Sequence, residues 1–206
     1  MLKLWGRNNS VNVQKVIWCL EELKLPYERI DAGMQYGVVD EPQFRKLNPN
    51  GLVPVIEDGG AVIWESNAIV RYLGAKYGKG DLWPEDPAAR AQSDKWMDWC
   101  ATVYWPPMRT VFWGLVRTPP EKRNMEEIEA ARKKAGETLK ILDAALAGSD
   151  YIAGKAPTIG DIPLGAISWR WFGIAMERPS LPNVEAWFER LGQRQAFRKS
   201  VMLPLT

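Results

Sequence analysis

Two short polar segments carry the side chains with which this chain could do chemistry. Residues 7–12 (RNNSVN) place Ser10 and Asn12 directly before an apolar pattern of helical spacing. The pair Glu65-Ser66 stands in the same way before a second helical pattern. Donors at a helix N-terminus stabilise anions, because the first backbone amides there have no partner within the helix. Both segments are therefore candidate sites for an anionic group.

The chain contains no histidine, and this absence restricts the chemistry further. No imidazole can act as an acid, a base or a metal ligand. The two cysteines, Cys19 and Cys100, lie far apart and show no metal-type spacing. Cys19 falls within an apolar helical pattern, which predicts a small buried side chain. Any catalysis must therefore use hydroxyls, amides, carboxylates, the backbone or a cofactor.

The composition is that of an ordinary soluble globular protein. Of 206 residues, 46% are hydrophobic and 25% are charged, and eleven tryptophans predict an aromatic-rich core or pocket. The formal net charge of +2 gives no electrostatic reason to expect nucleic acid or an anionic membrane as a partner. No apolar run approaches the roughly 18 residues of a membrane span, and the N-terminal apolar run is too short for a signal peptide. We therefore expect a cytoplasmic protein.

The elements that must position the candidate residues begin with a β-loop-α-β pattern. Residues 2–6 alternate apolar and polar side chains, which predicts a strand. From Val13 the apolar spacing predicts a helix, which Pro26 should end before a second strand at residues 27–30. This order is the start of a thioredoxin-like domain.

Residues 48–66 (NPNGLVPVIEDGGAVIWES) then predict a turn, a hairpin and a helix start. Two β-type runs flank the hairpin signal Gly59-Gly60. This stretch resembles the glutathione-binding half of the glutathione transferase family, and the following SNAIVRYL matches the third helix of that family. The resemblance covers essentially the whole chain, and it is to serine-type members of the theta/nu-like bacterial or fungal kind.

The resemblance assigns roles to this stretch. Val53-Pro54 corresponds to a cis-proline step, where the residue before proline offers its amide and carbonyl to the cysteinyl unit of glutathione. Ser66 would hold the γ-glutamyl carboxylate at a helix N-terminus, and Glu65 would face the α-ammonium. Many relatives carry a lysine where this chain has Leu52, so the glycine end lacks one usual partner. The predicted glutathione-binding set is Gln35, Leu52, Val53, Pro54, Glu65 and Ser66, with Arg45 and Lys46 as further candidates for the glycine end.

Ser10 and Asn12 are the predicted catalytic residues. In serine-type relatives a serine at this place donates its hydroxyl to the glutathione sulfur, and some relatives carry an asparagine two residues further on. A free thiol has a pKa of about 8.5, and hydrogen bonds to the thiolate lower that value. The sequence supports a second reading equally well, in which Ser10 or Asn12 is the N-cap of the helix.

The resemblance further implies a thioredoxin-like domain at residues 1–78, a linker at 79–87 and an all-helical domain at 88–206. Pro106-Pro107 should kink or break the first long helix of that domain. The family places its electrophile site along this helix, although core packing is the simpler reading for each single aromatic. The predicted pocket wall is Tyr104, Trp105, Met108 and Trp113.

Three further segments predict helices of the bundle. Residues 125–146 have a regular apolar stripe, and residues 195–200 form a short amphipathic helix. Thr158 to Asp161 is a variant capping box before an almost wholly apolar helix, and its predicted role is structural.

The favoured function is conjugation of glutathione, as a co-substrate and without a metal, to a hydrophobic electrophile. Two alternatives stay open: a glutathione-dependent disulfide reductase or peroxidase in which Asn12 matters more, and a non-catalytic glutathione-binding protein. The resemblance implies a homodimer, in which Asp94 or Asp98 could approach the partner's glutathione. A surface salt bridge explains these two acids equally well.

Overall fold

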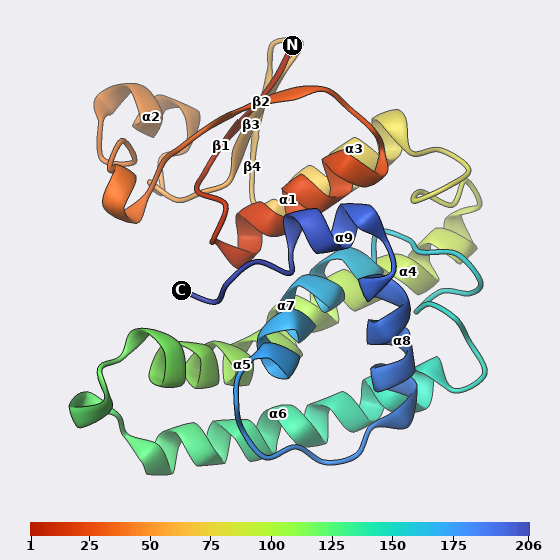
Figure 1. The fold of residues 1–206 in the computed structure, drawn as a ribbon. Coiled ribbons are helices and arrows are strands. Elements are labelled where there is room, and N and C mark those ends of the chain that lie inside the picture. The colour runs from red at the N-terminus through yellow and green to blue at the C-terminus, as the bar shows by residue number, and fades with distance from the viewer.

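A computed structural model describes all 206 residues (Figure 1). The first part of the chain alternates strands and helices and ends at Tyr77. Its elements are β1 (Leu2–Trp5), α1 (Val11–Glu22), β2 (Tyr27–Ile30), α2 (Pro42–Leu47), β3 (Val55–Asp58), β4 (Ala61–Trp64) and α3 (Ser66–Tyr77).

The four strands form one mixed sheet in the order β2-β1-β3-β4. β1 is parallel to β2, and β3 is antiparallel to both β1 and β4. Side chains alternate across the sheet, so Leu4 and Ile56 join the main core with α1 and α3. Trp5 and Val55 point to the other face, where Phe44 of α2 covers them. The predicted thioredoxin-like domain is confirmed.

The second part of the chain is all helical. None of its helices, and none elsewhere in the chain, is long and apolar enough to cross a membrane. Residues 79–86, within the predicted linker, contain no helix or strand. The helices are α4 (Pro87–Trp99), α5 (Trp105–Phe112), α6 (Met125–Leu146), α7 (Asp161–Gly173), α8 (Pro182–Gly192) and α9 (Gln195–Ser200).

The α-helix is interrupted directly before Pro106-Pro107, in agreement with the prediction that these prolines kink or break the first long helix. A π-helical turn, Cys100–Tyr104, joins α4 to α5, and a second one, Trp113–Arg117, follows α5. The prolines fall in the first turn of α5. A missing amide donor is tolerated there, and the wider turn before it accommodates the rings.

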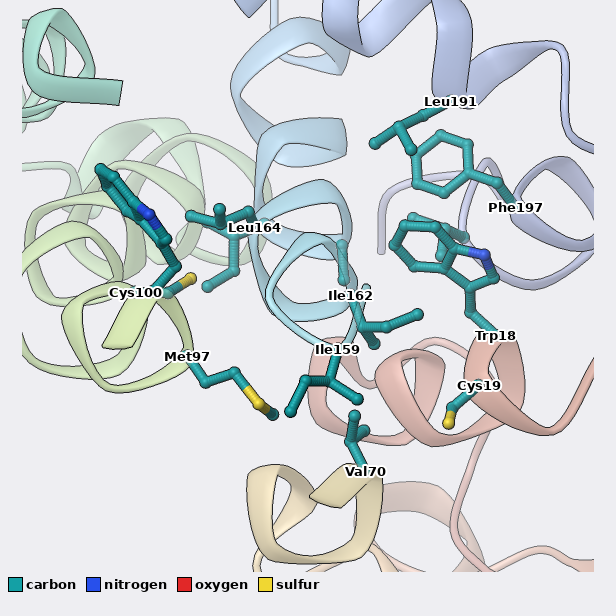
Figure 2. Close-up of a cluster of buried hydrophobic side chains, with 14 of the residues drawn as sticks. Trp18, Cys19, Val70, Met97, Cys100, Ile159, Ile162, Leu164, Leu191 and Phe197 are labelled. Atoms are coloured by element: carbon teal, nitrogen blue, oxygen red, sulfur yellow. The ribbon is translucent and has the colours of Figure 1, made fainter. Parts of the chain in front are cut away.

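Both parts of the chain share one core. A single cluster of 39 buried residues includes side chains from the sheet, from α1 and α3, and from the helical part. In Figure 2, Trp18 of α1 and Val70 of α3 lie among residues of α4, α7, α8 and α9. The Trp18 ring meets Phe197 of α9 edge to face at 4.7 Å. The shared core fixes α1, and with it Ser10, relative to the helical part.

Half of the predicted capping box is present before α7, whose N-cap is Gly160 and lacks a side-chain cap. The Asp161 carboxylate accepts hydrogen bonds from the Thr158 amide at 2.8 Å and from the Thr158 hydroxyl at 3.2 Å. It also accepts the amide of Ile152 at 3.1 Å and Nε1 of Trp187 at 2.9 Å. The box therefore ties the start of α7 to a preceding loop and to α8.

Candidate active site

A cavity of about 380 Å³ lies where α5 faces the loops of the thioredoxin-like part. Ser10 and Asn12 line it from the start of α1, and Leu52 and Val53 line it from the segment before β3. The wall on the helical side comes from α5 and from the π-helical turn after it. The complete lining is Arg7, Ser10, Val11, Asn12, Leu52, Val53, Trp105, Arg109, Phe112, Trp113 and Arg117.

Ser10 occupies the N-cap position of α1 but does not cap it. Its backbone is extended (φ −81°, ψ 125°), and its hydroxyl makes no hydrogen bond to the helix. The residue is 8% exposed. The hydroxyl therefore lies at the cavity without a partner in the chain, and the capping reading of Ser10 does not hold.

Asn12 is held in one orientation. Its Oδ1 accepts a hydrogen bond from Nζ of Lys15 at 3.0 Å and a longer one from the Ser66 hydroxyl at 3.4 Å. An ammonium group only donates, so the amide oxygen must face Lys15. The Asn12 Nδ2 group makes no hydrogen bond within the chain, which leaves it as a free donor beside the cavity.

Lys15 is a part of this arrangement that the sequence analysis missed. It is 4% exposed, and burial lowers its pKa, while Cys100 and Glu65 act in the opposite direction. The ammonium group of a buried lysine is costly unless a partner compensates it. The sequence carried one weak signal, since Lys15 and the neighbouring Gln14 interrupt the apolar run of residues 13–20. All eight of these residues are buried in the structure.

Val53 presents free backbone groups at the cavity. The Val53-Pro54 peptide bond is cis, as the resemblance implied. Neither the amide nor the carbonyl of Val53 is hydrogen-bonded within the chain, whereas β3 begins two residues later at Val55. An extended peptide could pair with these groups as an added strand does.

Glu65 and Ser66 stand at the start of α3. Glu65 has φ 68°, a region that side chains other than glycine adopt rarely, and it does not cap the helix. Ser66 is the buried first residue of α3 and contacts Asn12 through its hydroxyl. The two polar segments of the sequence therefore meet in the structure, and the contact joins Asn12 to Ser66.

The comparisons with known proteins agree with this geometry. The family model "Glutathione S-transferase, N-terminal domain" matches residues 1–75, and "Glutathione S-transferase, C-terminal domain" matches residues 104–195. The chain is 44% identical to glutathione S-transferase GstB of Escherichia coli, covering 100% of both chains. The chain belongs to the glutathione S-transferase family.

Solved structures place it more closely within the glutathione S-transferases. A theta class glutathione S-transferase from Xanthomonas axonopodis pv. citri, with glutathione bound, is 47% identical, with a TM-score of 0.96. That match covers 100% of this chain and 99% of the other. Glutathione S-transferase 3 of Zea mays is 32% identical over 97% of this chain and 93% of its own length. The predictions of the family, of a transferase enzyme and of its two-part fold are confirmed.

The predicted pocket wall of this glutathione S-transferase needs revision. Trp105 and Trp113 line the cavity, but Tyr104 and Met108 do not. Both of these side chains are fully buried in the core, where the Tyr104 hydroxyl lies 3.5 Å from that of Ser168. Residues 104 and 108 share the core face of α5, while 105, 109 and 112 share the cavity face.

Residues that the sequence analysis missed complete the lining. Phe112, Arg7 and Arg117 belong to the cavity, as does Arg109, which the predicted set omitted. The ring of Phe112 follows the helical spacing from Trp105, so the correct face of α5 would have included it. Arg7 and Arg117 come from distant parts of the chain, and no local pattern links them.

The glycine-end candidates lie outside the cavity lining. Gln35 is exposed on a 3-10 turn, Met34–Tyr36, and makes no hydrogen bond. Arg45 is engaged by Asp40 at 2.7 Å and by the carbonyl of Pro49 at 2.9 Å. A role for Gln35 in glutathione binding stays a prediction.

Proposed function

We propose that this chain activates glutathione through Ser10 and transfers the glutathionyl group, through its sulfur, to a hydrophobic electrophile. One observation carries the proposal. The unpartnered hydroxyl of Ser10 and the unpartnered backbone amide and carbonyl of Val53 line the same cavity. A cysteinyl unit paired with Val53 would bring its thiol toward the start of α1.

The remaining parts of glutathione fit the neighbouring residues by charge. The γ-glutamyl carboxylate would bind Ser66 and the uncapped first amides of α3, where the helix dipole favours an anion. Glu65 would receive the α-ammonium group. Leu52 lies 62% exposed beside Val53 and offers no charge to the glycine end, for which Gln35 stays the proposed contact.

The chemistry then needs no histidine. The Ser10 hydroxyl and the Asn12 amide would donate to the sulfur and stabilise the thiolate, and the thiol proton would leave to solvent. Lowering the thiol pKa by two units takes about 2.7 kcal/mol, within reach of such donors and the dipole of α1. The thiolate would attack an electrophilic carbon against Trp105 and Trp113. A carbon–sulfur bond forms, and the leaving group departs with its electron pair.

A second candidate, glutathione-dependent reduction of disulfides or peroxides, gains support from Asn12. Lys15 fixes the amide so that Nδ2 is the free donor, and this group could stabilise a sulfur other than that of glutathione. In this case the second substrate would be a mixed disulfide or a hydroperoxide.

A thermal unfolding experiment with glutathione tests the shared first step. At a glutathione concentration of 100 times its dissociation constant, binding should add about 2.7 kcal/mol to the free energy of unfolding. No shift at millimolar glutathione would overturn both candidates. Initial rates with a chloronitroaryl compound, a hydroperoxide and a mixed disulfide then decide between transfer and reduction.

We also propose a homodimer. Within one chain Asp94 and Asp98 both pair with Arg71, at 2.6 Å and 2.5 Å, which satisfies the surface salt-bridge reading of these acids. Sedimentation at micromolar protein measures the assembly directly, and a mass of 23.4 kDa would exclude the dimer.

A further inference from the structure

Three arginines line the cavity at Ser10, and no carboxylate lines it. Arg7 follows β1, Arg109 belongs to α5, and Arg117 ends the π-helical turn after α5. A guanidinium group stays protonated under all ordinary conditions. The lining of the cavity therefore carries positive charge, on both the loop before α1 and the helical side, that no lining residue neutralises.

Aromatic rings flank two of these guanidinium groups, and neither group pairs with an Asp or Glu side chain. Arg109 lies 5.8 Å from the centre of the Trp113 ring. Arg117 lies 4.8 Å from the Trp113 ring and 5.1 Å from the Phe112 ring, and it donates to the main-chain oxygen of Thr206 at 3.2 Å and 3.1 Å. A cation–π contact orients a guanidinium group without using up its N–H donors.

Arg7 is also without a carboxylate partner. Its Nε is buried and makes no hydrogen bond. Burial lowers the pKa of Arg7, and Arg117 lowers it further. Behind Phe112, burial and the charge of Arg117 lower the pKa of Arg170 to about 9. The charges in this region thus repel one another, and an anion in the cavity would relieve that repulsion.

We propose that the electrophile of this enzyme carries an anionic group, a carboxylate or a sulfonate, on an aromatic or other apolar frame. The proposal rests on the function proposed above and names its substrate class. Trp105 and Trp113 would contact the apolar frame. The planar guanidinium groups would bind the anionic group, since their paired donors match the two oxygens of a carboxylate.

The glycine carboxylate of glutathione is the competing occupant of these arginines. It is a single carboxylate, and one bidentate arginine would satisfy it. Three arginines arranged around an aromatic wall exceed that need. The two occupants differ in a measurable way, because an arginine that binds glutathione affects its KM with every electrophile.

A matched pair of electrophiles tests the proposal. 4-Chloro-3,5-dinitrobenzoate carries the carboxylate, and 4-chloro-3,5-dinitrobenzamide replaces it with a neutral group of similar size. With either one, the thiolate forms a carbon–sulfur bond at the carbon that bears chlorine, and chloride leaves with the electron pair. Each kcat/KM is divided by the rate constant of the uncatalysed reaction with glutathione, which removes the difference in intrinsic reactivity.

We expect the normalised kcat/KM of the benzoate to exceed that of the benzamide roughly tenfold, as a charge-assisted hydrogen bond would give. Arg109→Gln should lower this ratio, and Arg109→Glu should invert it. Arg109 makes no hydrogen bond within the chain and is exposed, so both variants should fold. Lys134→Gln, on the exposed face of α6, removes one positive charge elsewhere and should leave the ratio as it is.

The outcomes separate the two proposals. Conjugation of the benzamide without preference for the benzoate overturns the anionic substrate class and leaves the transferase function standing. If the KM of the Arg109→Gln enzyme for glutathione rises equally with both electrophiles, this arginine binds glutathione. That result also overturns the anionic substrate class. Failure to conjugate either compound, together with no thermal shift by glutathione, overturns both.

Discussion

A hydroxyl residue lies at or shortly before the start of α1 and of α7, and the two starts are built in opposite ways. At α7 the Asp161 carboxylate accepts four hydrogen bonds, two of them from Thr158. Burial raises the pKa of Asp161, while these hydrogen bonds act to lower it. At α1 the hydroxyl of Ser10 accepts nothing from the helix and donates to no side chain.

The difference in hydrogen bonding between these two helix starts separates a structural role of the polar residues from a functional one. A buried polar group that is fully hydrogen-bonded contributes to stability and has no capacity left for a ligand. A helix start that forgoes its cap keeps both a side-chain donor and backbone amides for a bound anion. The unpartnered hydroxyl at Ser10 is therefore consistent with the proposed role of this residue in binding the glutathione sulfur.

The largest effect is expected at the start of α7, where Asp161 accepts four hydrogen bonds. Asp161→Ala should lower the free energy of unfolding by roughly 3 kcal/mol or more, because the amides of Thr158 and Ile152 and Nε1 of Trp187 lose their acceptor while buried. Urea unfolding measures this. Conjugating activity per folded molecule should stay within about twofold of the parent value.

Asp161→Asn is the control, since its amide oxygen keeps part of the acceptor capacity and the loss should be smaller. A stable Asp161→Ala protein with impaired conjugating activity would mean that the start of α7, and not that of α1, serves the function.

Ser10→Ala should give the opposite result. We expect kcat/KM for glutathione conjugation at pH 7 to fall about 25-fold, because a rise of the thiol pKa from about 6.5 to about 8.5 lowers the thiolate fraction by that factor. The deficit should shrink as the pH rises above about 8.5, where the unassisted thiol ionises by itself. The free energy of unfolding should change by less than about 0.5 kcal/mol. Replacing a serine that caps a helix by alanine would instead lower it by about 1 kcal/mol.

Ser10→Thr keeps the hydroxyl and should retain most of the activity. A Ser10→Ala enzyme with full activity and lower stability would show that the serine is a cap after all.

Much of the fold follows from local signals in the sequence. The bounds of α6 and α9 agree with the predicted segments 125–146 and 195–200, because the apolar spacing defines them locally. The hairpin around Gly59-Gly60 is likewise fixed by turn chemistry, since both glycines have positive φ.

The site could be predicted in part, and the reasons for the failures are physical. Tyr104 and Met108 were placed on the wall by their apolar character alone, although the polar Arg109 marks a different face of α5 from the one that Met108 occupies. The burial of Lys15 depends on Asn12 and on the charge of Glu65, which only the folded chain brings near. Long-range contacts of this kind leave no periodic trace in the sequence.

Lys15→Met tests whether the lysine at the start of α1 orients Asn12. Without the ammonium group, Asn12 can turn its oxygen toward the sulfur, so kcat/KM should fall about tenfold, the value of one hydrogen bond. The free energy of unfolding at pH 7 should hold or rise, because a buried charge is replaced by an apolar side chain.

The pH dependence gives an independent check on Lys15. Burial lowers its pKa in the folded chain below the unfolded value, so the unfolded chain binds more protons between the two values. The stability contributed at this residue should therefore rise as the pH rises through the folded pKa toward about 10.4. Lys15→Met should lack this rise, and Lys3→Met on the exposed side of β1 should keep it.

The smallest expected effect concerns a third helix start, that of α3. Glu65 adopts φ 68° and ψ 111°, a conformation that costs a residue with a side chain roughly 1–3 kcal/mol. Glu65→Gly should relieve this strain and raise the free energy of unfolding by about 1 kcal/mol, net of the added freedom of the unfolded chain. Glu65→Ala keeps the strain and should show no gain, while both variants remove the carboxylate and should weaken glutathione binding equally. Urea unfolding and glutathione titration of the pair separate the two contributions. Equal stabilities of the two variants would mean that the backbone at Glu65 is unstrained.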